Sequence, residues 1–192
     1  MNLPNKLTVL RIVLVPFMVA ALLIDFPLNN LAALALFGAA SLTDLFDGKI
    51  ARKRGLVTDF GKFADPLADK ILVISALLCF VQLGLCDCIA VIIVLLREFS
   101  VTSIRLIAAS KGKVIAANIW GKVKTVTQMV AIICIMVMQT VLDLGCLGVS
   151  LPCCLCGIFR RTGEILIWIS TFFAVLSGVI YLKQNKQFIA DK

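Results

Sequence analysis

The chain has 192 residues, of which 61% are hydrophobic and only 16% charged, and its mean hydropathy is +1.05. Soluble domains are about 45–50% apolar and about a quarter charged, so this composition excludes an ordinary soluble domain, and it excludes a disordered chain as well. The formal net charge is +8, but so apolar a chain does not fit a nucleic-acid-binding protein, and we expect no nucleic acid partner.

Six apolar stretches follow one another along the chain, each close to the roughly 20 residues that cross a bilayer. They are Leu7–Ile24, Asn29–Leu45, Phe63–Gly84, Cys88–Ser110, Ile119–Leu142 and Thr162–Leu182. Charged residues lie within or at the ends of nearly all of them, which is typical of helices that line an internal polar cavity. We therefore predict an all-α polytopic membrane protein, a single domain over residues 1–192 built as a six-transmembrane-helix bundle.

Basic residues gather on one side of the predicted bundle. Lys6, the Lys49–Lys62 connection and Lys113 fall on that side, together with the lysines near the C-terminus, whereas the turns at Asp25 and Asp87 carry no Lys or Arg. Cytoplasmic loops of membrane proteins are enriched in Lys and Arg. Both termini and the polar cavity are therefore expected to face the cytoplasm.

Four aspartates stand out because charge inside an apolar helix is costly. Asp44 and Asp47 are three residues apart, and Asp65 and Asp69 are four apart, so each pair shares one helix face. Carboxylates brought together in this way repel one another unless a cation joins them. The chain has no histidine, and an all-oxygen site selects hard divalent cations such as Mg²⁺, Mn²⁺ or Ca²⁺.

Small residues lie four positions from three of these aspartates and leave room for a ligand near the backbone. They are Gly48, Ala51 and Gly61. Two such cations can clamp a phosphoryl group during displacement. A protein that carries divalent cations across the membrane on the same carboxylates is the alternative from another functional class.

The complete pattern reads Asp44-x-x-Asp47-Gly48-x-x-Ala51-Arg52, eight residues, then Gly61-x-x-x-Asp65-x-x-x-Asp69. It resembles the signature of the CDP-alcohol phosphatidyltransferases at all eight defining positions. The segments Leu3–Arg11, Arg97–Phe99 and Gly121–Gln128 resemble the members of this family whose acceptor is sn-glycerol 3-phosphate.

This resemblance implies a homodimeric membrane enzyme that moves the phosphatidyl group of CDP-diacylglycerol onto an alcohol and releases CMP. The implied ligands of one or two Mg²⁺ or Mn²⁺ ions, with two favoured, are Asp44, Asp47, Asp65 and Asp69. Asp69 is also the implied general base. The residues implied to bind the nucleotide are Gly48, Ala51, Arg52, Gly61 and Thr8.

A phosphorylated acceptor needs cations that face the cavity. Arg97, Arg105, Lys122 and Arg11 are the candidates, because central charges in spans must avoid lipid. The alternatives are that Arg11 and Lys122 extend to the interface and that Glu98 pairs with Arg105. The cations favour sn-glycerol 3-phosphate over serine, and they leave inositol phosphate and phosphatidylglycerol open as acceptors.

Most of the eight cysteines lie apart from the aspartates. Six of them fall at the two outer loops, namely Cys86, Cys88, Cys146, Cys153, Cys154 and Cys156. A disulfide or a zinc cluster is one interpretation, because both loops face the same compartment. We favour the other, in which they are small apolar residues of membrane-embedded turns.

Overall fold

The computed structural model describes residues 3–54, 59–110, 119–146, 152 and 154–185, and the side chains of 5–43, 64–109, 119–145, 152 and 154–185. Every regular element in this part of the chain is a helix. The helices are α1 (Leu3–Leu23), α2 (Asn29–Arg54), α3 (Asp59–Gln82), α4 (Cys88–Ser110), α5 (Ile119–Cys146) and α6 (Leu155–Gln184). The prediction of an all-α chain with six helices is confirmed for these residues.

The predicted boundaries differ from the observed ones where charged residues end an apolar stretch without ending the helix. Helix α2 continues to Arg54 and α3 begins at Asp59, so most of the predicted Lys49–Lys62 connection is helical. Helix α6 begins at Leu155 and not at Thr162. Lysine and arginine are good helix formers, so basic residues interrupt the hydropathy while the backbone continues.

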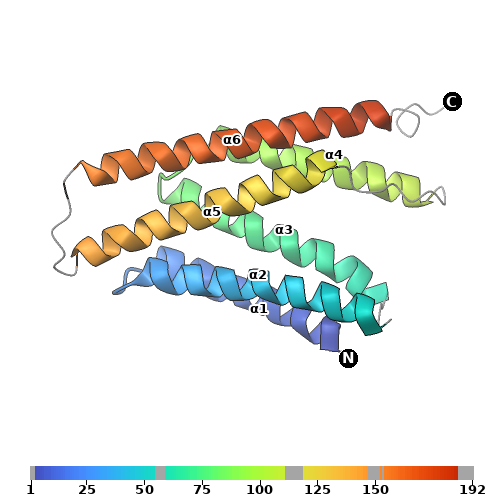
Figure 1. The fold of residues 1–192 in the computed structure, drawn as a ribbon, viewed down its shortest axis with the longest axis horizontal. Helices are drawn as coiled ribbons and strands as arrows, with labels where there is room; N and C mark the ends of the chain where they lie inside the picture. Colours follow the sequence, from blue (N-terminus) through green and yellow to red (C-terminus); the bar gives the residue numbers. More distant parts are fainter. Residues whose placement is uncertain (1–2, 55–58, 111–118, 147–151, 153, 186–192) are drawn as a thin grey trace.

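The helices form a bundle in which α1 packs most extensively on α2, and α5 on α6 (Figure 1). Helix α3 contacts α1, α2, α4 and α5, and α4 packs against α6. Helix α1 begins and α6 ends at the same end of the bundle, at the right of Figure 1, where α2 also ends and α3 begins. Asp65 and Asp69, in the first half of α3, therefore lie toward the end of the bundle where α1 begins and α6 ends.

Three of the described helices, α1, α5 and α6, are long and apolar enough to cross a membrane. Their candidate spans are Asn5–Leu23, Ile119–Gly145 and Leu155–Gln184. The apolar part of α2 is shorter, Asn29–Thr43, and α4 carries Arg97, Glu98 and Arg105 within its length. The charges that lower the hydropathy of α2 and α4 are the ones expected from the sequence to line a polar cavity.

The core consists of apolar side chains shared by the helices, with Met18, Phe37, Phe80, Ile132 and Met136 fully buried. The turn between α3 and α4 depends on Gly84, which has φ 67°. Its amide donates to the carbonyl of Val81 and the next amide, of Leu85, to the carbonyl of Phe80. These two bonds form the helix-ending motif in which a left-handed glycine satisfies the last carbonyls.

Candidate active site

The two described aspartates of α3 are each held by a side chain of α1. The hydroxyl of Thr8 donates to Asp65 Oδ1 at 2.5 Å, and Arg11 Nη1 donates to Asp69 Oδ1 at 2.6 Å. Thr8 and Arg11 are three residues apart, and the aspartates are four apart, so one face of each helix meets one face of the other. Both carboxylates therefore have their orientation set by α1.

The ion pair of Arg11 and Asp69 is asymmetric in its exposure. The side chain of Arg11 has 0% of its surface exposed, whereas that of Asp69 is 49% exposed. A buried guanidinium needs an acid for compensation, and charge-assisted bonds of this length are among the stronger ones. Arg11 thus anchors one oxygen of a carboxylate whose other side remains accessible.

Two cavities are lined by residues of α3, α4, α5 and α6. The smaller, of about 260 Å³, is lined by residues including Asp69, Lys70, Glu98, Arg105, Lys124, Thr125 and Gln128. The larger, of about 520 Å³, is lined by residues including Lys70, Arg97, Glu98, Arg105, Lys122, Thr125, Ser177 and Tyr181. The two cavities adjoin, because four residues line both of them: Lys70, Glu98, Arg105 and Thr125. Asp69 lines the smaller cavity, and most of the cations line the larger one.

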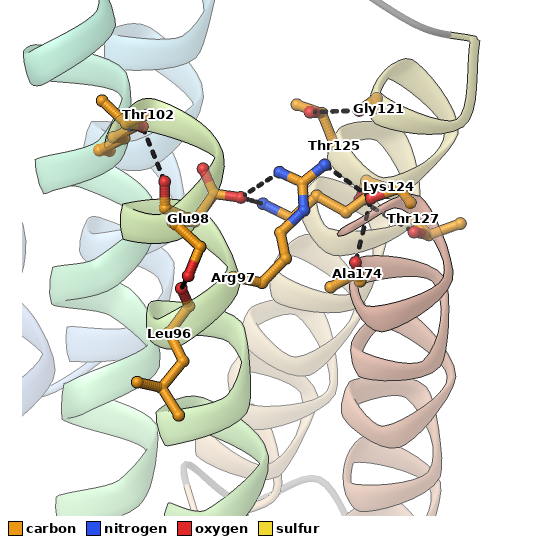
Figure 2. Close-up of polar contacts among 12 residues, drawn as sticks. Leu96, Arg97, Glu98, Thr102, Gly121, Lys124, Thr125, Thr127 and Ala174 are labelled. Atoms are coloured by element: carbon orange, nitrogen blue, oxygen red, sulfur yellow. Dashed lines mark hydrogen bonds and ion pairs between the residues drawn. The ribbon is translucent and has the colours of Figure 1, made fainter. Parts of the chain in front are cut away.

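Glu98 makes two ion pairs, one within α4 and one that joins α4 to α5. Its Oε1 accepts from Arg97 Nη1 of α4 and from Lys124 Nζ of α5, both at 2.7 Å. Figure 2 shows both cations directed at the Glu98 carboxylate. The predicted alternative that Glu98 pairs with Arg105 is wrong, because its ion pairs are with the neighbouring Arg97 and with a lysine of the next helix.

Arg97 crosses from α4 to α6. Its Nη2 donates to the hydroxyl of Ser177 at 2.6 Å. A Cβ on Gly178 would stand 2.9 Å from Arg97 Cγ, which is closer than real contacts allow, so the absence of a side chain at Gly178 lets the arginine pass. The Arg97 guanidinium therefore connects α4 to α6, and its partner Glu98 connects α4 to Lys124 of α5.

The remaining cations of the larger cavity have separate surroundings. Arg105 lies with its guanidinium carbon 5.7 Å from the ring centre of Tyr181, a cation–π arrangement. Lys70 of α3 donates to the hydroxyl of Thr102 on α4. Lys122 is exposed at the cavity wall near the start of α5.

The structure brings together most of the described candidates. Arg97, Arg105 and Lys122 line the larger cavity, and Asp69 lines the smaller one. Arg11 does not lie where a phosphate ligand was expected. It pairs with Asp69 and is not among the residues that line either cavity. The other candidates lie outside the residues whose side chains are described: Asp44, Asp47, Gly48, Ala51, Arg52 and Gly61.

Several lining residues received no role from the sequence, among them Lys70, Gln128 and Tyr181. Lys70 and Tyr181 were missed, and Gln128 was noticed only as part of a family-like segment. A basic residue directly after Asp69 was a signal for Lys70. No sequence signal places Tyr181 next to Arg105, since 76 residues separate them and only the packing of α4 on α6 brings them together.

The described cysteines carry free thiols: Cys79, Cys86, Cys88, Cys134, Cys154 and Cys156. Cys88 begins α4 and Cys156 lies in α6, so neither is a loop residue as predicted. Among the described side chains, no group of three or more His, Cys, Asp or Glu residues stands close enough to hold a metal ion. Asp44 and Asp47, half of the expected metal ligands, are outside that set.

The model of the CDP-alcohol phosphatidyltransferase family matches residues 1–179 of this chain. The chain belongs to this family. It is 40% identical to the CDP-diacylglycerol–glycerol-3-phosphate 3-phosphatidyltransferase of Bacillus subtilis, over 96% of this chain and 95% of that protein. Proteins of the same name from Rickettsia bellii (36% identical, 97% of each chain) and Haemophilus influenzae (38% identical, 68% of this chain and 73% of that protein) are also similar.

Proposed function

We propose that the protein transfers the phosphatidyl group of CDP-diacylglycerol to sn-glycerol 3-phosphate, giving phosphatidylglycerophosphate and CMP. Membership of the family, together with relatives of that name that match nearly the full chain, supports this reaction. The observation that carries the choice of acceptor is the larger cavity, where four basic side chains and one acid, Glu98, form part of the wall. Such a cavity suits an acceptor that itself bears a phosphate.

The acceptor phosphate binds in the larger cavity. Arg105 and Lys122 approach it from α4 and α5, and Arg97 reaches it from the side, held between Glu98 and Ser177. Guanidinium and ammonium groups are the usual ligands of phosphate oxygens in proteins. Lys70, which lines both cavities, adds a cation between the phosphate and the reacting hydroxyl.

The acceptor's primary hydroxyl lies in the smaller cavity beside Asp69. Its oxygen attacks the phosphatidyl phosphorus, its proton passes to the Asp69 carboxylate, and the bond between that phosphorus and the CMP oxygen breaks, so that CMP leaves with the electron pair. Arg11 is a positioning residue in this scheme, because it fixes Asp69 Oδ1 at 2.6 Å. A carboxylate held in one orientation within reach of the hydroxyl acts as general base.

The residues present fit a divalent cation. Asp65 and Asp69 are oxygen donors one helical turn apart, and Asp69 is 49% exposed toward the cavity. With Asp44 and Asp47 they would hold one or two divalent cations, which we propose to be Mg²⁺ or Mn²⁺. Dependence on a divalent cation is general for the family. A bound cation supplies charge neutralisation at the diphosphate.

Gly48, Ala51, Arg52 and Gly61 are proposed to bind the cytidine nucleotide. Thr8 supports that region by holding Asp65.

We place all six helices across the membrane as one domain over residues 1–192, with both termini and the active site at the cytoplasmic face. Helix α1 begins and α6 ends at the same end of the bundle (Figure 1), which agrees with both termini facing one side of the membrane. The excess of Lys and Arg on that side supports its assignment to the cytoplasm. CMP, a soluble product, then leaves directly into the cytoplasm. The homodimer implied by the family resemblance stays a prediction.

The test is CMP release by the purified protein in detergent with CDP-diacylglycerol and one acceptor at a time. We expect release with sn-glycerol 3-phosphate, dependent on Mg²⁺ or Mn²⁺ and abolished by EDTA. Release with inositol phosphate, serine or phosphatidylglycerol instead would identify another acceptor in the same family. Transport of a divalent cation without any CMP release would contradict the proposal.

A further inference from the structure

Three buried polar groups of cavity-lining residues have no hydrogen-bond partner among the described residues. They are the Nε of Arg97, whose two Nη atoms already bond Glu98 and Ser177, the carboxamide nitrogen of Gln128 and the hydroxyl of Tyr181. Gln128 is only 2% exposed and lines the smaller cavity, and Tyr181 is 3% exposed and lines the larger one. Leaving a buried donor unpaired is costly, so each group is satisfied when a molecule in the cavity supplies the missing oxygen.

Gln128 and Tyr181 line different members of the pair of adjoining cavities. Tyr181 is next to the cations, with Arg105 over its ring, and an anionic oxygen there would accept from its hydroxyl. Gln128 shares the smaller cavity with Asp69, where a carboxylate must take a proton from the reacting hydroxyl. A single acceptor with its phosphate toward Tyr181 and its alcohol toward Asp69 would contact both.

The oxygen that Gln128 contacts follows from the chemistry of the acceptor. The primary hydroxyl of glycerol 3-phosphate attacks with a lone pair and gives its proton to Asp69, so a donor on that oxygen would weaken the nucleophile. The phosphate belongs to the cations. The secondary hydroxyl is what remains, and its oxygen can accept from the carboxamide.

We infer that Gln128 is the specificity-determining residue that recognises the secondary hydroxyl of a glycerol phosphate acceptor, while the Tyr181 hydroxyl contacts the acceptor's phosphate. This inference rests on the proposed function, which it deepens from a phosphorylated alcohol to a vicinal diol phosphate. A buried donor placed for a hydroxyl discriminates against an acceptor that lacks it, because the donor then stays unpaired.

The test compares two acceptors in the CMP-release assay: sn-glycerol 3-phosphate and 3-hydroxypropyl phosphate, which keeps the primary hydroxyl and the phosphate but lacks the secondary hydroxyl. The wild type should prefer glycerol 3-phosphate by about tenfold or more in kcat/KM. Gln128→Met keeps the length of the side chain and removes the donor. It should lower kcat/KM for glycerol 3-phosphate about tenfold and change that for 3-hydroxypropyl phosphate by less than about twofold.

Two further variants separate recognition from folding. Tyr181→Phe keeps the ring under Arg105 and should lower kcat/KM for both acceptors by a similar factor, because both carry the phosphate. Thr140→Val removes a buried hydroxyl of α5 that bonds the carbonyl of Met136, one helical turn earlier in α5, and should change neither value. Activity on 3-hydroxypropyl phosphate reports that the Gln128 variant is folded, and Gln128→Leu replaces it if Gln128→Met does not purify.

Equal losses on both acceptors in Gln128→Met, or no loss on either, would overturn the assignment of Gln128 while leaving the proposed function standing. A wild type that uses both acceptors equally well would also overturn it. CMP release with neither acceptor would instead mean that the proposed function has failed, and the inference with it.

Discussion

Arg11 of α1 and Asp69 of α3 form an ion pair 2.6 Å long in which the guanidinium is fully buried and the carboxylate is half-exposed. The pair joins the first helix to the helix that carries the proposed general base, 58 residues later in the chain. Its exposed member faces the cavity where the acceptor's hydroxyl is proposed to bind. The orientation of the base therefore depends on a residue that does not line the cavity.

Replacing Arg11 with Gln should lower kcat by roughly one to two decades, because one charge-assisted bond contributes about 1.5–3 kcal/mol. The KM for glycerol 3-phosphate should change little, and Arg11→Lys should restore part of the rate. Steady-state kinetics on the three proteins checks this. A higher KM for glycerol 3-phosphate with unchanged kcat would instead make Arg11 an acceptor contact, as the sequence suggested.

Replacing Glu98 with Gln should destabilise the bundle strongly. The change leaves the side chains of Arg97 and Lys124, 13% and 7% exposed, next to each other without the carboxylate that both contact. Breaking a buried ion pair from one side costs about 3–5 kcal/mol. Thermal unfolding in detergent measures the loss, with Glu164→Gln, a change at an exposed position, as the matched control. Equal melting temperatures for the two variants would contradict the role given to Glu98.

Replacing Lys122 or Arg105 with Gln should raise the KM for glycerol 3-phosphate by about one to two decades and leave that for CDP-diacylglycerol nearly unchanged. Both residues line the larger cavity, away from the signature aspartates. Lys183→Gln, at the exposed end of α6, is the control for loss of positive charge alone. If CDP-diacylglycerol binding were lost and acceptor binding kept, these cations would belong to the donor site.

The thiol of Cys86, in the turn between α3 and α4, should react slowly with maleimides at neutral pH. Burial, reinforced by the nearby charges of Asp87 and Glu164, raises the pKa of Cys86 to about 11. Thiolate is the reactive form, so a higher pKa means less of it at any lower pH. Labelling of a variant that keeps only Cys86 should rise about tenfold per pH unit between about pH 7 and 10. A variant that keeps only Cys88, which is exposed, is the comparison, and a rate for Cys86 that does not change with pH would contradict the burial.

The helices were predictable because apolar periodicity and length determine where a chain can cross a membrane. The bounds of α4 match the expected stretch Cys88–Ser110 residue for residue. The beginning of α6 was missed because Arg160 and Arg161 interrupt the apolar run, although arginine is compatible with a helix. Hydropathy predicts that a helix is present more accurately than it predicts the residues at which the helix begins and ends.

The site was predictable only as far as residues share one helix. The common face of Asp65 and Asp69 follows from their spacing, whereas their partners Thr8 and Arg11 depend on α1 packing against α3. The same limit explains the wrong partner for Glu98. Spacing along one helix suggested Arg105, but the side chain of Lys124 reaches Glu98 from another helix, 26 residues further on.

If Asp69 and the cationic cavity act on one acceptor, labelled glycerol 3-phosphate is transferred into lipid, and this transfer can be measured. Purified protein in vesicles that contain CDP-diacylglycerol is given ³²P-labelled sn-glycerol 3-phosphate and Mg²⁺, and the label extracted into chloroform is compared with the CMP released. We expect equal amounts of labelled lipid and CMP from the wild type, and a loss of both by orders of magnitude in Asp69→Asn. Label that stays in the aqueous phase with the wild type, or full transfer by Asp69→Asn, would contradict this expectation.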